Sequence, residues 1–123
     1  TAITPLPAMT VTPGGQFGGS RGHNGVDLRA SIGTPVRVPK SGKVIASWNG
    51  GDGGQQMRVQ LDDGSIHGFA HLSDRNFRRG QRVNQGDVIG ATGNSGLHTS
   101  GPHLHYTVEV DGEKINPLDY HRG

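Results

Sequence analysis

Glycine content is the feature that most constrains this chain, since 22 of its 123 residues are glycine. Glycine destabilises the interior of a helix or strand, and its usual place is a turn. The glycines here separate short apolar runs, and no stretch shows a sustained repeat of about 3.6 residues. The sequence therefore predicts an all-β protein, an antiparallel β-sheet with little or no helix.

Turn signals bound the expected strands. The clearest is Asp62-Asp63-Gly64, because an Asp-Gly pair between two apolar runs is typical of a β-hairpin. Strands are predicted at residues 9–12, 36–38, 43–48, 55–61, 65–71, 88–91, 104–110 and 114–115. Residues 1–8 hold two prolines, which disfavour helix, and we interpret them as a linker or extended lead-in to a single domain over residues 9–123.

Charge and cysteine content exclude several classes of function. The formal net charge is only +2, which is weak evidence for a nucleic-acid partner, so no nucleic acid is expected. The absence of cysteine rules out disulfides, thiolate catalysis and cysteine-ligated zinc. No apolar run approaches the roughly 18 residues of a transmembrane segment. We expect a monomer, either a mature product or a domain of a longer chain.

Histidine is the residue type that points to chemistry. The chain has seven: His23, His67, His71, His98, His103, His105 and His121. His103 and His105 stand two apart at the start of an expected strand, so their side chains point to the same face. Both imidazoles can reach one metal ion, or one can bind metal while the other faces substrate. The opposite face of this strand, Leu104, Tyr106, Val108 and Val110, is expected to be buried.

His23 and Asp27 are a second candidate pair of ligands. Four residues of strand would separate them by about 13 Å, but Gly25 between them allows a bend. With His105 they supply two imidazoles and one carboxylate and leave a fourth position for water, which is the ligand count of a catalytic zinc site. The alternative is an aspartate that caps a turn beside a surface histidine.

The other histidines receive separate interpretations. His71 ends the second strand of the hairpin. His67 shares its face but lies about 13 Å back along the strand, and we predict a rim or surface position for it. His98 and His121 are expected to be solvated.

Competing reaction types lack the residues they need. The chain has no H-E-x-x-H helix, no G-x-S-x-G nucleophile elbow and no phosphate-binding G-x-x-x-x-G-K-[ST] loop. A cluster of basic residues is interpreted as a solvated face. The alternative is a binding surface for an anionic cell wall. The members of the cluster are Arg75, Arg78, Arg79 and Arg82.

Three motifs together resemble the lysostaphin-type (LytM-like) zinc endopeptidases of peptidoglycan. They are H-x-G-x-D at residues 23–27, F-A-H-L-S at residues 69–73 and H-L-H at residues 103–105. The resemblance covers nearly the whole chain, from about residue 11 to residue 118. It implies a substrate groove formed by loops over an antiparallel sheet, with one zinc ion bound by His23, Asp27 and His105. It also implies that His71 and His103 are the unliganded catalytic pair, which activates water and stabilises the oxyanion.

The function that this resemblance implies is hydrolysis of peptide bonds in bacterial peptidoglycan, in the cross-bridge or the stem peptide. Residues 9–123 would form a single zinc metallopeptidase catalytic domain, located extracytoplasmically (secreted, periplasmic or in the cell wall) or carried on a phage virion. The alternatives are a non-catalytic wall-binding or activator domain on the same fold, and a structural piece of a phage tail or secretion device.

Two departures from the family pattern bear on the groove. Phe69 stands where many members have tyrosine, so a hydroxyl that could bind substrate is missing. Residues 52–54 read Asp-Gly-Gly in place of the more usual Gly-Tyr-Gly, which is expected to change the wall of the groove.

Overall fold

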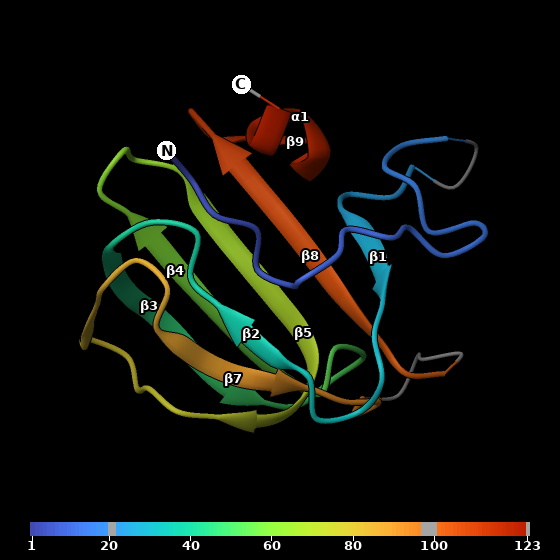
Figure 1. The fold of residues 1–123 in the computed structure, drawn as a ribbon, viewed down its shortest axis with the longest axis horizontal. Coiled ribbons are helices and arrows are strands. Elements are labelled where there is room, and N and C mark those ends of the chain that lie inside the picture. Colours follow the sequence, from blue (N-terminus) through green and yellow to red (C-terminus); the bar gives the residue numbers. More distant parts are fainter. Residues whose placement is uncertain (20–21, 97–100, 123) are drawn as a thin grey trace.

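The computed structural model describes residues 1–19, 22–96 and 101–122, and these form one antiparallel sheet of nine strands with one short helix (Figure 1). The strands are β1 (Val26–Arg29), β2 (Pro35–Arg37), β3 (Gly42–Asn49), β4 (Gln55–Leu61), β5 (Ile66–Arg75), β6 (Arg82–Val83), β7 (Val88–Thr92), β8 (His103–Val110) and β9 (Glu113–Ile115). The helix is α1 (Pro117–Arg122). The predicted all-β class is confirmed.

The strand order in the sheet is β1-β8-β5-β4-β3-β6, with β9 on β8 and β7 joining β2 to β5. The Asp62-Asp63-Gly64 turn joins β4 to β5, as predicted. The strand predicted at residues 9–12 is wrong, because Val11 forms only an isolated bridge to Leu28.

Three short elements were not predicted: β1, β6 and α1. The sequence does carry a start signal for the helix. The Asn116 side chain accepts a hydrogen bond from the Leu118 amide at 3.0 Å, and Pro117 occupies the first helical position. Asparagine is favoured immediately before a helix because its side chain can accept a hydrogen bond from an amide of the first turn. Proline is favoured at the first helical position because the amide hydrogen it lacks would have no partner within the helix.

The two faces of the sheet have opposite characters. Segment 1–12, β2 and β7 lie over one face of the long strands (Figure 1), and the apolar core fills the space beneath them. Leu6 in this segment is 2% exposed, and Pro5 accepts a hydrogen bond from the Arg37 amide at 2.9 Å. The other face carries Gln56, Arg58 and Thr107, which are only partly buried, so a substrate can approach the sheet from that side.

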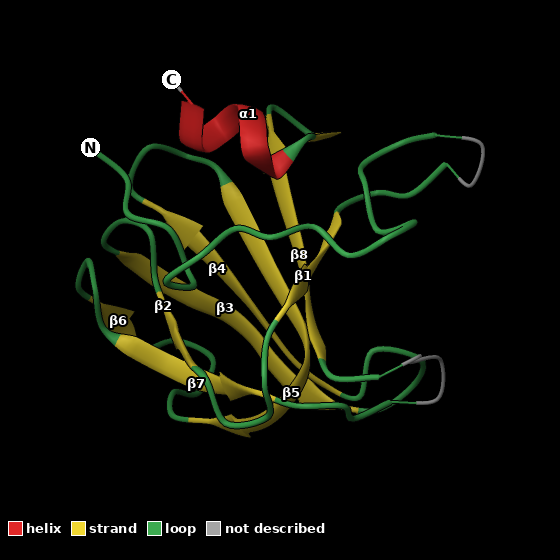
Figure 2. Cartoon of the chain, turned by 45° about the vertical axis from the view of Figure 1, so that its right-hand side comes forward, coloured by secondary structure: helices red, strands yellow, loops and turns green. Residues whose placement is uncertain are grey.

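The helix lies at one end of the sheet, where it packs on β8 (Figure 2). No helix in the described part of the chain is long and apolar enough to cross a membrane.

His67 lies in the core and is fully buried, so the predicted rim or surface position is wrong. Its two ring nitrogens are paired, Nε2 with Ser65 Oγ at 2.9 Å and Nδ1 with Tyr106 Oη at 2.7 Å. The Ser65 hydroxyl donates to the Asp63 carboxylate, so His67 Nε2–H donates to Ser65 and Nδ1 accepts from Tyr106. His121 extends this hydrogen-bond network, since its Nε2 lies 2.8 Å from Tyr106 Oη. The predicted solvated position of His121 is therefore also wrong.

This network requires neutral His67, and we expect a measurable effect of pH on stability. Burial, with a smaller contribution from His121, lowers the pKa of His67 to about 3. Between pH 6.5 and 3 the unfolded chain binds a proton at this residue and the folded chain does not, so acidification reduces the free energy of unfolding, by up to about 1.4 kcal/mol per pH unit. Urea unfolding of the wild type and a His67→Gln variant, in chelator, measures the effect. A steep wild-type dependence that the variant retains would contradict it.

Candidate metal centre

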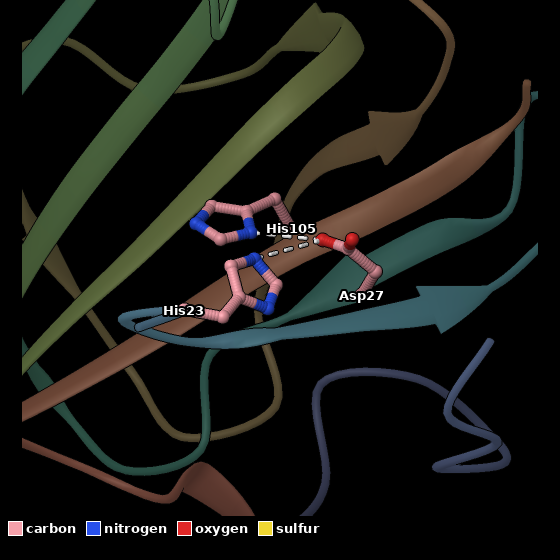
Figure 3. A group of neighbouring side chains, drawn as sticks. All are labelled: His23, Asp27 and His105. Carbon is pink, nitrogen blue, oxygen red and sulfur yellow. Dashed lines mark hydrogen bonds and ion pairs between the residues drawn. The ribbon is translucent and has the colours of Figure 1, made fainter. Parts of the chain in front are cut away.

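His23, Asp27 and His105 come together on the open face of the sheet (Figure 3). β1 pairs with β8 so that Asp27 lies directly opposite His105. Asp27 Oδ1 is 2.9 Å from His105 Nδ1 and 3.6 Å from His23 Nε2. The three ligand atoms all lie within 4.8 Å of one another. The predicted proximity of His23 to Asp27 is thus present in the structure.

The chain bends at Asn24 and Gly25, between His23 and Asp27, as expected. Before this bend, His23 forms a backbone bridge to Gly18. Gly25 also permits close approach to β8, since a Cβ atom there would lie 2.4 Å from the Tyr106 carbonyl oxygen. The absence of a side chain at Gly25 therefore lets the segment between His23 and Asp27 pack closely against β8, the strand that carries His105.

The donor set fits a zinc ion in its chemistry, and the two separations that involve Asp27 are close to those of a zinc site. His23 Nδ1 donates to the Gln16 carbonyl at 3.2 Å, which leaves the Nε2 lone pair free and directed toward Asp27. A ligand histidine whose other nitrogen donates to a backbone carbonyl is a common arrangement at metal sites. Ligand atoms of a tetrahedral zinc site lie roughly 3.3 Å apart, given metal–ligand distances of about 2.0 Å. The separations of 2.9 and 3.6 Å lie on either side of that value.

The charge on Asp27 suits a metal ligand. Burial alone would raise the pKa of this carboxyl, but the hydrogen bond from His105 and the neighbouring imidazoles of His103 and His23 outweigh burial and lower it. Asp27 is therefore an ionised carboxylate at neutral pH.

His103 lies beside this trio, on the same face of β8 as His105. Its Nδ1 donates to the Gly101 carbonyl at 2.7 Å, and its Nε2 is 3.6 Å from Asp27 Oδ1. The prediction that the two histidines of H-x-H share one face agrees with this geometry. On the opposite face Leu104, Tyr106 and Val108 are fully buried, as expected, whereas Val110 is only partly buried.

His71 reaches the site through an exception to strand alternation. Alternation along β5 would place it on the core face with His67 and Phe69, but its φ of 62° is in the left-handed region. The ring centroid consequently lies 4.6 Å from that of His103. Backbone strain of this kind is concentrated at functional sites, where the surrounding structure maintains it.

Hydrogen bonds fix both ends of His71. Its amide donates to the Gly53 carbonyl and its Nδ1 donates to the Ser95 carbonyl, each at 2.7 Å. Burial lowers the pKa of His71, and the bond to Ser95 offsets this only in part. The side chain is therefore a neutral imidazole near pH 7 with its Nε2 lone pair available.

Comparison with known proteins gives the family. Residues 21–117 match peptidase family M23. The chain belongs to this family. The resemblance inferred from the three motifs is thereby confirmed.

M23 relatives with different named activities resemble this chain. Peptidoglycan DD-endopeptidase ShyA of Vibrio cholerae is 38% identical over 96 residues, 78% of this chain and 22% of that protein. Glycyl-glycine endopeptidase ALE-1 of Staphylococcus capitis is 40% identical over 87 residues, 68% of this chain and 24% of that protein. A zinc-containing peptidase from Vibrio cholerae shares the fold, with 25% identity and a TM-score of 0.78, over 94% of this chain and 39% of that one. The chain thus spans less than a quarter of either curated relative.

The two departures from the M23 pattern have different consequences. Phe69 is 1% exposed and its ring stacks on Tyr106 with centroids 5.3 Å apart, so this side chain packs in the core. Gly54 has a φ of 63°, and a Cβ atom there would lie 2.4 Å from the Gly96 amide nitrogen. Gly54 therefore lets the β3–β4 turn press against residues 95–96, where Ser95 holds His71.

The arginine cluster of this M23 domain does not form one uniform patch. Arg82 is paired with the Asp62 carboxylate through two hydrogen bonds of 2.9 and 2.7 Å. Arg75 donates to Gln55 and Ser47, both at 3.1 Å, and lines a separate hollow with Arg78 and Arg79. His98, predicted to be solvated, lies outside the described residues.

Proposed function

We propose that this M23 domain is a zinc metalloendopeptidase that hydrolyses peptide bonds of bacterial peptidoglycan, in the cross-bridge or the stem peptide. The observation that carries the proposal is a two-imidazole, one-carboxylate ligand set with two further histidines beside it. The named activities of ShyA and ALE-1 and the zinc in the structural relative support it. Retention of both the ligands and the neighbouring histidines favours an enzyme over a wall-binding or structural domain.

Zinc would be held by His23, Asp27 and His105, and when bound it supplies Lewis acidity that polarises a carbonyl and increases the acidity of water. His71 acts as the general base: its Nε2 takes a proton from the attacking water while its Nδ1–H stays on the Ser95 carbonyl. The water oxygen bonds to the carbonyl carbon, the C–N bond breaks, and the proton passes from Nε2 to the leaving amine.

His103 supplies the second function. Its Nδ1–H is held by the Gly101 carbonyl, so its Nε2, when protonated, can donate to the oxygen on which negative charge develops. The chain contains only two glutamates, Glu109 and Glu113, and neither belongs to the ligand group, so histidine takes the role that glutamate has in H-E-x-x-H peptidases. A wall substrate places the protein outside the cytoplasm or on a virion.

Removal of the metal gives a direct test. We expect one zinc per chain by metal analysis, complete loss of wall hydrolysis in chelator, and recovery on addition of one equivalent of zinc. Mass spectrometry of the muropeptides released from purified walls, both glycine-bridged and directly cross-linked, identifies the bond that is cut. Wall lysis that persists after the zinc has been removed, or zinc-loaded protein that cuts neither wall, would contradict the proposed function.

A further inference from the structure

A hollow of about 250 Å³ adjoins the metal centre on the open face of the sheet. His105 forms one side of it, next to the metal ligands, and exposed Trp48 lies at its rim. Arg58 and Lys114 also line it, so its charged side chains away from the metal are basic.

Arg58 is the unusual member of this lining. It is only partly exposed, and its guanidinium has no ion pair or hydrogen bond within the described parts of the chain. Lys114, in contrast, is paired with Glu109 at 3.2 Å. A guanidinium is always charged and carries five donors in a planar fork that matches a carboxylate. A half-buried guanidinium without a protein partner is therefore available to bind an anionic group of a ligand.

The register of the sheet places Arg58 at a defined distance from the metal ligands. Arg58 pairs with Gly68 and Gly68 with Thr107, so the three form a row across β4, β5 and β8. Thr107 follows His105 by two residues, so this row lies about 7 Å along the strands from the ligand row, and Arg58 stands about 10 Å across from β8. The backbone offset is therefore about 12 Å, and the long arginine side chain can extend over about half of it, so its guanidinium can reach a group near a metal-bound amide.

Gly68 lines the hollow and, because it has no side chain, leaves space there for a neighbouring group. A Cβ atom at Gly68 would lie 2.4 Å from Thr107 Oγ1, so the Thr107 hydroxyl occupies the space above the glycine. This places a second possible donor between Arg58 and the metal centre.

We propose that this hollow is an anion subsite of the substrate groove, in which Arg58 binds a free carboxylate of a stem peptide close to the bond that is cut. The inference rests on the proposed function and adds the substrate class. A cross-link between D-alanine and diaminopimelate keeps one free carboxylate, that of diaminopimelate, beside the scissile amide, whereas a polyglycine bridge has no ionised group along its length. The enzyme therefore cuts direct stem-peptide cross-links in preference to glycine bridges. Family membership does not decide between the two substrates, because ShyA is named a peptidoglycan DD-endopeptidase and ALE-1 a glycyl-glycine endopeptidase.

The test uses two cross-linked muropeptide dimers that differ only in whether the diaminopimelate carboxyl group is free or amidated. We expect the zinc-loaded wild type to prefer the free acid by about 10- to 100-fold in kcat/KM, the size of one charge-assisted hydrogen bond. Arg58→Ala should remove this preference, mainly through a raised KM for the free acid, with unchanged zinc content. Arg58→Lys keeps the charge without the fork and should retain part of the preference.

Lys43→Ala is the matched control, since it removes an exposed positive charge from β3 that does not line the hollow. Its preference should equal that of the wild type. Equal cleavage of acid and amide by the wild type, or a preference that survives in Arg58→Ala, overturns the subsite while leaving the proposed function intact.

Calorimetric binding of an uncrosslinked stem tetrapeptide, as acid and amide, separates the two proposals. If no dimer is hydrolysed but the acid binds more tightly and only when Arg58 is present, the peptidase assignment fails and the subsite stands. Binding that does not distinguish acid from amide overturns the subsite.

Discussion

Replacing His71 by alanine should lower the rate of wall-peptide hydrolysis by about 10²- to 10⁴-fold while one zinc stays bound, because a positioned general base contributes about that much. His103→Ala should cost about 10²- to 10³-fold, the usual cost of one lost oxyanion donor. Both expectations follow from the orientation of the rings: each Nδ1 is held by a backbone carbonyl at 2.7 Å, so each Nε2 is free to act.

The double variant gives a sharper result. His71 and His103 would act on the same water and the same developing charge, and their ring centroids lie 4.6 Å apart. The combined loss should therefore be much smaller than the product of the single losses. Independent, multiplying losses would mean that the two residues act in separate steps.

Zinc content distinguishes ligand from catalyst in this series. His103 needs the check most, because its Nε2 is as close to Asp27 Oδ1 as His23 Nε2 is, 3.6 Å in both cases. His105→Ala should lose zinc and His103→Ala should keep it. His121→Ala is the matched control, since it removes an imidazole from the core side of the same sheet, and its rate should be close to that of the wild type. A His103→Ala variant that loses its zinc would move this residue into the ligand set.

The candidate ligands could be predicted because short-range rules determine their placement. The side chains of residues two apart on a strand point to the same face, and those of His103 and His105 both contact Asp27. The cross-strand pairing of Asp27 with His105 could not be read from the sequence, because β1 is only four residues long and its partner lies about 80 positions later. The three family motifs supplied that long-range information instead.

Strand alternation identifies which residues share a face but not which face is covered, and this explains the wrong position predicted for His67. His67 shares its face with Phe69, and this face turned out to be the core, where Ser65 and Tyr106 satisfy both ring nitrogens. His71 would belong to the same face, and a single left-handed residue turns it toward the metal centre. Positive φ at a non-glycine residue has no reliable sequence signal, since it depends on contacts such as those with Gly53 and Ser95.

Asp27→Ala should have the largest effect of any single substitution, with loss of tight zinc binding and of all zinc-dependent hydrolysis. The Asp27 carboxylate is the one anionic group of the ligand trio, and its Oδ1 atom contacts both His23 and His105. Changes in partners outside the ligand shell typically cost 10- to 100-fold in metal affinity, so removal of a ligand should cost more than about 100-fold. Competition with a chromophoric chelator measures the affinity, and metal analysis after dialysis gives the stoichiometry.

The control for this experiment is Asp62→Ala, which removes an exposed carboxylate paired with Arg82 far from the ligand trio in the sequence, and should leave zinc affinity unchanged. Asp27→Asn keeps an oxygen in place without the charge and should bind zinc with intermediate affinity, because the ion prefers an ionised ligand. The fold should survive both changes at Asp27, since β1 is held to β8 by its backbone pairing, with Asp27 opposite His105. Stoichiometric, tightly bound zinc in a folded Asp27→Ala protein would show that the ion is held elsewhere, and the roles proposed for His71 and His103 would be lost with the site.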